Sequence, residues 1–268
     1  MRKIFFLIAL LFSANAQAQQ RLIAVGGDVT EIIYALGKQD LLIASDSSAY
    51  FPKEAEKLPK IGYQRNLSAE GILSLKPDLI IANAGAGPSL AIKQIKQAKV
   101  KFYQLKEENS KENLINKIAT IGEILGAQRQ AKELIKKLNF EFAEIKNPKK
   151  SPKILFLFQF GKGSLMVAGK DTAADAIIKI SGGKNIANSY AGYKPFNQEF
   201  LALYNPDLIL TTNQVLEGVG GLQELKKLFA SQEINAIKNS KIVAMDSLLL
   251  LGFTPRLPSA IKQLQSNF

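Results

Sequence analysis

Residues 68–82 read Ser-Ala-Glu-Gly-Ile-Leu-Ser-Leu-Lys-Pro-Asp-Leu-Ile-Ile-Ala, and residues 197–211 read Asn-Gln-Glu-Phe-Leu-Ala-Leu-Tyr-Asn-Pro-Asp-Leu-Ile-Leu-Thr. Each stretch combines a helical start, a Pro-Asp corner and an apolar strand, and the two align without gaps. Such a corner can recur by chance, because proline after a helix and aspartate before a strand are common turn chemistry. The surrounding elements repeat in the same order, however, which favours an internal duplication. The identical pairs are Glu70 and Glu199, Pro77 and Pro206, Asp78 and Asp207, Leu79 and Leu208, and Ile80 and Ile209.

Short apolar or β-branched runs around both stretches indicate strands. In the first half they are residues 21–25, 41–45, 79–82 and 100–105, and in the second half residues 154–158, 208–211 and 242–245. Segments of helical period or turn signals separate them, which predicts an α/β fold with parallel strands. Asp28 and Glu31 have the spacing of a capping box, so we expect a helix that starts there and ends at Gly37.

A helical segment separates the two halves. Apolar residues recur at helical spacing from Lys111 to Lys146, with a break at Gly126, and Pro148 and Pro152 end the pattern. We therefore predict two Rossmann-like lobes with parallel sheets, joined by a single long α-helix, with a ligand cleft between them. A helical connector bends less readily than strands, so we expect little hinge closure. The predicted boundaries are 19–126 for the N-terminal lobe, 127–147 for the connecting helix and 148–268 for the C-terminal lobe.

The first 18 residues have the pattern of a secretory signal peptide. Arg2 and Lys3 precede an apolar run from Ile4 to Phe12, and small residues end at Ala18, after which we expect cleavage. The apolar run is far shorter than the roughly 20 residues that cross a bilayer. The chain has no cysteine for a lipid anchor. The expectation is a free protein of the Gram-negative periplasm.

The composition restricts the chemistry. The 268 residues include no histidine and no cysteine, which removes the usual metal ligands and every triad that needs either residue. A hard metal ion would have to bind carboxylate or phenolate. The formal charge of +12 suits an anionic ligand, and the scattered basic residues predict no nucleic-acid partner. An exported hydrolase is the alternative from another class, but no paired carboxylates or Gly-x-Ser-x-Gly motif supports it.

The segment from residue 58 to residue 78 is the most informative. It gives a loop that holds Tyr63 and Arg65, followed by a helix whose N-cap is Ser68. From the residues alone, a loop tyrosine usually packs through its amphipathic ring, and a loop arginine is usually solvated.

With its neighbours, this loop resembles the periplasmic haem-binding proteins of bacterial haem-uptake ABC transporters, which are class III substrate-binding proteins of the cobalamin and siderophore type. The resemblance covers nearly the whole mature chain. Its motifs are Gly-Gly-Asp-Val-Thr-Glu-Ile-Ile-Tyr-Ala-Leu-Gly at 26–37, Gly-Tyr-Gln-Arg at 62–65 before Leu-Ser-Ala-Glu-Gly at 67–71, and Val-Ala-Gly-Lys-Asp-Thr-Ala-Ala-Asp-Ala at 167–176.

The resemblance implies that Tyr63 is the axial ligand of ferric haem b, the transported cargo, and that Arg65 is its partner. Free tyrosine titrates near pH 10, so phenolate binding at neutral pH needs Fe(III) and a nearby cation. Tyrosine is a known axial ligand of haem iron. Arg65 could instead pair with a propionate.

The second-lobe loop departs from some of these relatives. Where they place a second ligand, a histidine, this chain reads Gln-Phe-Gly-Lys-Gly at 159–163, so five-coordinate binding through Tyr63 is the expected geometry. Phe160 is expected to stack on the porphyrin and Lys162 to meet a propionate. Tyr193 and Tyr190 are the reserve phenol ligands, although packing at the core edge also explains them.

Glu70 and Glu199 occupy matching positions in the repeat. Acids in the first helical turn can simply complement the helix dipole. The resemblance instead implies that each docks against the two-fold permease dimer, which works with its ATPase. A monomer is expected, and an outer-membrane receptor could supply the haem. The remaining alternative within the binding class is a cobalamin or ferric-siderophore carrier of the same fold.

Overall fold

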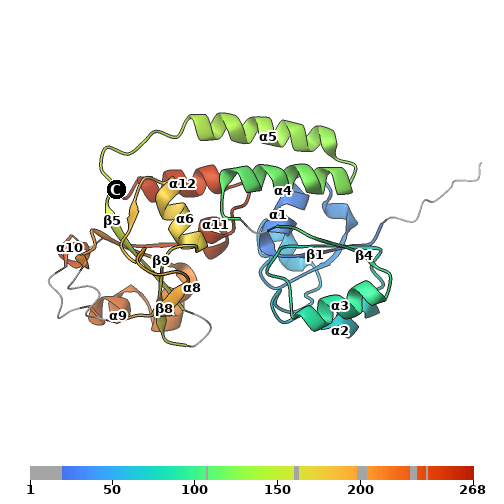
Figure 1. Ribbon diagram of the computed structural model, residues 1–268, viewed down its shortest axis with the longest axis horizontal. Helices are drawn as coiled ribbons and strands as arrows, with labels where there is room; N and C mark the ends of the chain where they lie inside the picture. The colour runs from blue at the N-terminus through green and yellow to red at the C-terminus, as the bar shows by residue number, and fades with distance from the viewer. Residues whose placement is uncertain (1–19, 107, 160–162, 198–203, 230–233, 240) are drawn as a thin grey trace, which may run out of the picture.

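The computed structural model describes residues 20–106, 108–159, 163–197, 204–229, 234–239 and 241–268. They form two α/β lobes side by side, with helices above the space between them (Figure 1). The predicted signal peptide lies outside the described residues. Among the described helices, none is both long enough and apolar enough to cross a membrane.

The first lobe contains a parallel sheet in the order β2-β1-β3-β4. Its strands are β1 (Leu22–Val25), β2 (Leu42–Ser45), β3 (Leu79–Ala82) and β4 (Lys101–Gln104). Its helices are α1 (Gly27–Ala35), α2 (Ala69–Ser74), α3 (Ser89–Gln97) and α4 (Lys111–Ile124). All residues of β1 and β3 are buried, as expected of central strands covered on both faces.

The second lobe differs from the prediction in its sheet. There β10, β9 and β5 run parallel, together with the short β7 beside β5. The chain then reverses after β5, so β6 pairs antiparallel with β5, and β8 pairs antiparallel with β6. Alternating strands and helices predict parallel pairing. The β5–β6 hairpin breaks this alternation, because no described helix separates its two strands. The strands are β5 (Lys153–Gln159), β6 (Leu165–Ala168), β7 (Lys184–Asn185), β8 (Tyr193–Pro195), β9 (Leu208–Thr212) and β10 (Ile242–Met245). The helices include α6 (Ala173–Ile180), α8 (Asn213–Val219), α9 (Leu222–Lys227), α10 (Asn235–Lys238), α11 (Ser247–Leu251) and α12 (Leu257–Gln265).

The two lobes repeat the same corner. The carboxylate of Asp78 accepts a hydrogen bond from the backbone N–H of Arg21 (2.9 Å), and that of Asp207 accepts one from Lys153 (2.8 Å). In both cases the aspartate before one strand binds the backbone at the start of the neighbouring strand, at Arg21 just before β1 and at Lys153 in β5. The residue before each proline has a positive φ, 47° at Lys76 and 41° at Asn205. The shared bond and the shared backbone conformation support the duplication.

Two helix starts test the predicted caps. Ser68 is the N-cap of α2, and its Oγ accepts a bond of 3.2 Å from the N–H of Gly71, as predicted. The predicted capping box at Asp28 is wrong, because α1 begins after Gly26, whose φ is 116°. The Asp28 carboxylate instead forms a buried ion pair of 2.7 Å with Lys117. Asp28 therefore binds a side chain distant in the sequence and does not cap its own helix.

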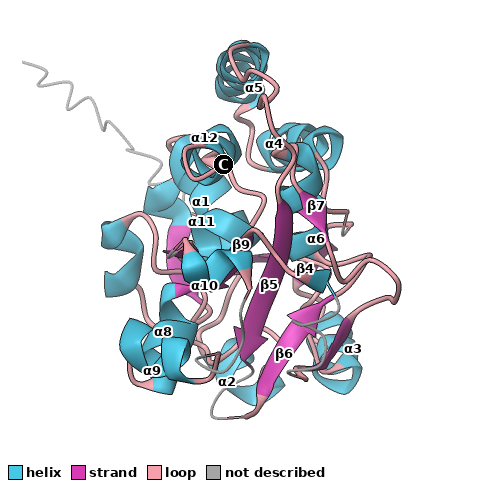
Figure 2. Cartoon of the chain, turned by 90° about the vertical axis from the view of Figure 1, so that its left-hand side faces the viewer, coloured by secondary structure: helices cyan, strands magenta, loops and turns pink. Residues whose placement is uncertain are grey.

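Helices α4 and α5 (Gln128–Ala143) carry the chain from the first sheet to the second. Figures 1 and 2 show α5 as the outermost layer, lying over α4 and α12. The break predicted near Gly126 lies between α4 and α5. The side chain of Gln265, on α12, donates to the carbonyl of Lys146 after α5 (3.1 Å).

One ion pair joins the lobes directly. The guanidinium of Arg256, at the start of α12, donates two bonds to the Glu31 carboxylate on α1 (2.9 and 2.8 Å). The guanidinium carbon lies 3.5 Å from the ring centre of Phe51, a cation–π contact. Beside it, the Tyr50 hydroxyl accepts from the N–H of Leu248 (2.8 Å), and burial raises the pKa of this phenol. These contacts fix the spacing of the lobes at one end of the cleft.

Replacing Arg256 with methionine should destabilise the protein. The variant keeps an apolar stem but leaves the 3% exposed Glu31 without its partner, which costs about 3 kcal/mol. The melting temperature should fall by roughly 6 °C or more. Arg129→Met, on the exposed surface of α5, is the control and should change the melting temperature little. Equal stability of Arg256→Met and wild type would contradict the assigned role.

Candidate functional site

The carboxyl ends of β1, β2 and β3 meet around a buried carboxylate. Asp46 directly follows β2 and is fully buried. One oxygen accepts bonds from the N–H of Gly26 (2.8 Å) and the hydroxyl of Ser48 (3.0 Å). The other accepts from the N–H groups of Ser48 (3.0 Å) and Gln64 (3.2 Å). These four bonds compensate for the loss of water around the charge and tie three loops to one point.

The amide of Asn83, directly after β3, forms a second connection. Its Nδ2 group donates to Asp28 (3.1 Å) and to Oε1 of Gln64. A Cβ added at Gly26 would lie 2.5 Å from that nitrogen, so only glycine fits there. Gly26, the first residue after β1, therefore allows the Asn83 amide to reach both partners.

The loop from Gly62 to Asn66 is held along its backbone as well. The Gly62 carbonyl accepts from the N–H of Ser47, and the Gln64 carbonyl accepts from the N–H of Gly87 (both 2.8 Å). Lys60, just before the loop, donates from Nζ to Ser45, Ala49 and Ala55. Burial lowers the pKa of Lys60, an effect that the negative charge of Asp46 opposes.

Tyr63 and Arg65 project from this fixed loop. Tyr63 is 48% exposed, one of the more exposed large aromatic residues, and Arg65 is also exposed. Within the described part of the chain, the Tyr63 hydroxyl has no hydrogen-bond partner and Arg65 has no acidic partner. The side chain of Arg65 lies over Gly85, where an added Cβ would be 4.0 Å from Nε. A phenol and a guanidinium that are both available to a ligand thus lie two residues apart in the sequence.

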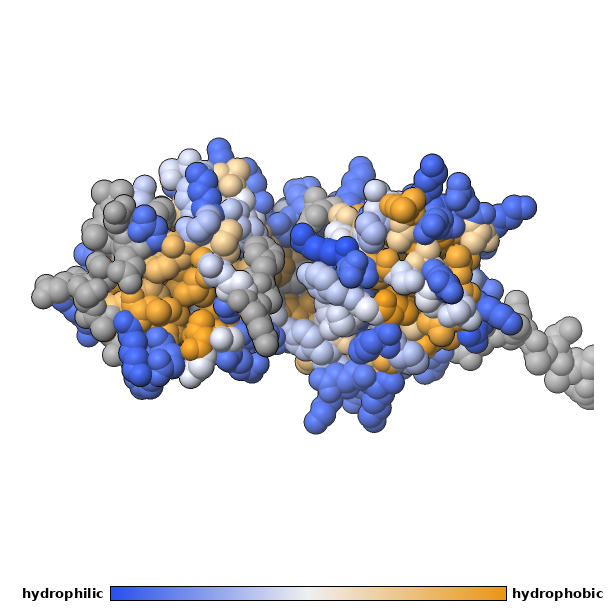
Figure 3. Space-filling model, turned by 90° about the horizontal axis from the view of Figure 1, so that it is seen from below, coloured by the Kyte–Doolittle hydropathy of each residue, from blue (hydrophilic) through white to orange (hydrophobic). Residues whose placement is uncertain are grey.

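The lobe contacts place this edge at the cleft. Gly27, after β1, lies against Leu248 of α11, the helix that follows β10, and the Tyr50 hydroxyl, after β2, accepts a bond from the N–H of the same residue. The carboxyl ends of both sheets therefore face each other. This is where ligands of open α/β sheets bind. Figure 3 views the face opposite α5 and shows the molecule hollowed between the two lobes.

The second-lobe candidates have different outcomes. Phe160, Lys162 and Glu199 lie outside the described residues, so their roles stay predictions. Tyr193 lies on β8, half-buried, with its ring centre 5.7 Å from that of Phe158. Burial raises the pKa of Tyr190, and Lys194 lies 4.5 Å from its ring centre. Both tyrosines pack within their own lobe, and their roles as reserve ligands stay predictions.

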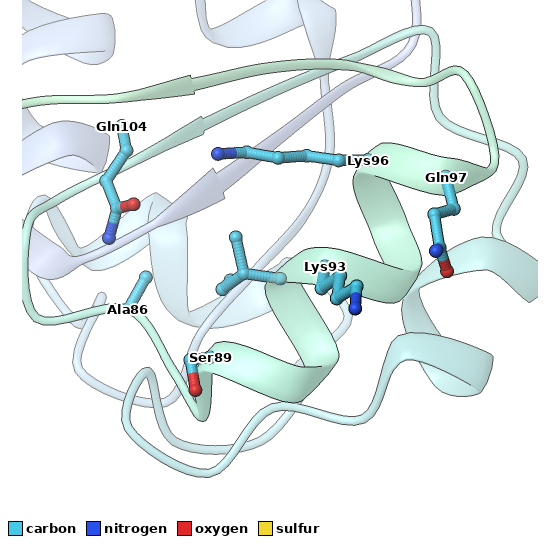
Figure 4. A pocket seen from close by; sticks show the side chains of 7 residues that line it. Ala86, Ser89, Lys93, Lys96, Gln97 and Gln104 are labelled. Carbon is cyan, nitrogen blue, oxygen red and sulfur yellow. The ribbon is translucent and has the colours of Figure 1, made fainter.

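Two hollows lie on the first lobe near α3. Figure 4 shows one of about 620 Å³ along α3, with Lys93, Lys96 and Gln104 at its wall. The other, of about 790 Å³, lies between α2 and α3, and the exposed Glu70 forms part of its rim. Tyr63 and Arg65 line neither of them. Glu70 is in the first turn of α2, as predicted.

Sequence reasoning missed the residues that support the loop. Asp46, Asn83 and Arg256 were not among the predicted site residues. Asp46 and Asn83 could have been found, because polar residues directly after parallel strands gather at one edge. No sequence signal indicates the pairing of Arg256 with Glu31, which lie 225 residues apart. Within the described residues, no cluster of three or more acidic, histidine or cysteine side chains could hold a metal ion.

Two α/β lobes with facing carboxyl edges and a helical crossing over one end define the class III substrate-binding proteins. The chain belongs to the periplasmic binding protein family, whose model matches residues 22–249. The resemblance stated from the sequence is confirmed.

Solved structures of two periplasmic heme-binding proteins are similar to this chain. RhuT from Roseiflexus sp. RS-1, in its apo form, has a TM-score of 0.88 and 36% identity, covering 93% of this chain and 97% of that one. BhuT, in complex with two hemes, has a TM-score of 0.87 and 34% identity, covering 92% and 97%. A vitamin B12-binding protein from Vibrio parahaemolyticus is 26% identical over 100% of this chain and 97% of its own length.

Proposed function

We propose that this protein is a periplasmic carrier that binds ferric haem through Tyr63 in the cleft between the lobes and delivers it to an ABC permease. The observation that carries the proposal is the exposed phenol of Tyr63, held beside Arg65 on a loop with several hydrogen bonds. The cargo is bound and released without chemical change, as expected of a substrate-binding protein.

The chemistry of the loop fits haem. The porphyrin supplies four nitrogen ligands, so one protein oxygen completes five-coordinate iron, and tyrosinate is a suitable hard donor for Fe(III). The Arg65 guanidinium would stabilise the negative oxygen. The positive charge of the chain, +12 in total and +10 without Arg2 and Lys3 of the expected signal peptide, suits the two propionates of haem b.

Cobalamin is the second candidate. RhuT and BhuT are 34–36% identical to this chain and the vitamin B12-binding protein from Vibrio parahaemolyticus is 26% identical, which favours haem over the corrinoid. A corrinoid carrier would need no phenolate from Tyr63. An exported hydrolase has no supporting motif in the sequence.

Tyr63→Phe should weaken hemin binding and remove the visible absorption of the Fe(III)–phenolate bond. Only an exposed hydroxyl is lost, so the melting temperature should stay within about 2 °C of wild type. A hemin titration followed by absorption spectroscopy measures both effects.

Tyr103→Phe is a matched control for this titration. Tyr103 lies on β4 and is 45% exposed, close to the 48% of Tyr63. Its replacement should leave both the spectrum and the affinity unchanged. If Tyr63→Phe also binds hemin with the wild-type spectrum and affinity, Tyr63 is not the iron ligand.

Arg65→Ala should weaken hemin binding most at neutral pH. Coordination releases the phenolic proton, and without the guanidinium this step is harder, so a higher pH should restore part of the affinity. Hemin affinities of the variant and of wild type between about pH 6 and pH 9 give the measurement. An equal loss at every pH would assign Arg65 to a propionate instead.

The proposed docking acids are Glu70 and Glu199. We propose that each contacts basic residues of a two-fold permease, so the double change to alanine should abolish haem uptake by the reconstituted transporter while hemin affinity stays unchanged. Each single change should give an intermediate rate. Glu112→Ala is the control, because Glu112 is an exposed acid in the first turn of α4. Wild-type uptake by the double variant would refute the docking role and leave the haem site intact.

A further inference from the structure

Gln64 lies between the two candidate ligand residues and differs from both. Tyr63 and Arg65 are exposed, whereas Gln64 is half-buried and bonded at three of its groups. Its N–H donates to Asp46 (3.2 Å), its carbonyl accepts from Gly87 (2.8 Å), and its Oε1 accepts from Asn83. Gln64 thus points inward and anchors the loop, whereas the residues on either side of it project outward.

The orientation of the Asn83 amide is set by charge. Lys117 pairs with one oxygen of Asp28 (2.7 Å), and the other Asp28 oxygen accepts from Nδ2 of Asn83 (3.1 Å). A flipped amide would place its oxygen against that carboxylate. The nitrogen therefore faces Asp28 and Gln64, so Gln64 must present its oxygen there.

The Asn83 amide completes a series of side-chain bonds. Lys117 donates to Asp28, and Asn83 donates from Nδ2 to both Asp28 and Gln64. Lys117 and Asp28 are buried, so this series ties the loop of Gln64 to α4 through groups shielded from solvent.

We propose that Gln64 is a positioning residue whose side-chain bond to Asn83 holds the loop in its binding conformation before haem arrives. In this conformation the Tyr63 hydroxyl is placed to bind the iron, and the Arg65 guanidinium is placed beside it. The inference rests on the proposed haem ligation by Tyr63. A loop placed in advance loses less conformational freedom on binding, which strengthens affinity without a new contact to the ligand.

Gln64→Met tests the proposal, because methionine has a similar length, keeps the backbone bonds and lacks the accepting oxygen. The hemin dissociation constant should rise about three- to tenfold, as expected for one hydrogen bond. The pH at which the phenolate absorption appears should rise by roughly half a unit to one unit. The melting temperature should fall by no more than about 4 °C. A merely structural role would not change the pH midpoint.

Gln104→Met is the control for this variant. The Gln104 amide supports the neighbouring loop by donating to Ala84 (3.2 Å), and it makes no bond to the loop that bears Tyr63. Its replacement should leave the hemin spectrum and its pH midpoint unchanged. A Gln64→Met protein with the wild-type affinity and pH midpoint overturns the proposal.

A double-mutant cycle with Asn83→Ala tests the partner. If Gln64 acts through Asn83, the double variant should bind hemin about as weakly as the weaker single variant, whereas fully additive losses would overturn the connection.

Tyr63→Phe in the same titrations separates the proposed iron ligation by Tyr63 from the proposed positioning by Gln64. If it removes the phenolate absorption and Gln64→Met has no effect, haem ligation stands and positioning fails. If Tyr63→Phe has no effect, the ligation itself fails.

Discussion

The cleft depends on the ion pair between Arg256 and Glu31. A buried carboxylate on α1 and an arginine at the start of α12 come from opposite lobes, and each is costly without the other. The ring of Phe51 lies against the guanidinium, and beside it the Tyr50 hydroxyl accepts from the N–H of Leu248 on α11. With α4 and α5 crossing the same side of the molecule (Figure 1), these contacts hold the carboxyl edges of the two sheets opposite each other.

Within the first lobe, a second buried carboxylate, that of Asp46, also holds separate segments together. Asp46 gathers the ends of β1 and β2 and the loop of Tyr63 around one buried charge. The result is a rigid inner layer of polar groups and an outer layer of uncommitted ones, Tyr63 and Arg65. Such a division suits a carrier, because the support is satisfied internally while the phenol and the guanidinium are left for the ligand. Enzymes need groups positioned against a reacting bond, whereas a carrier needs only affinity and release.

Much of the fold could be predicted because its signals are local. The strands at 79–82 and 242–245 were placed to the residue, and Ser68 caps its helix as expected, since apolar runs and caps depend on neighbouring residues. The hairpin of β5 and β6 was missed because its pairing is not visible in an alternating pattern. The Asp28 capping box was wrong because Lys117, far along the chain, binds that carboxylate. For the site, Tyr63 and Arg65 came from the family resemblance, whereas Asp46, Asn83 and Arg256 act through contacts between distant residues.

Haem binding through a phenolate in the cleft is tested by parallel titrations of the purified wild-type protein with hemin and with cyanocobalamin. We expect saturable hemin binding with a charge-transfer absorption that free hemin lacks, and no saturable binding of cyanocobalamin at the same concentrations. Tight binding of cyanocobalamin, with a hemin spectrum identical to that of the free ligand, would contradict it.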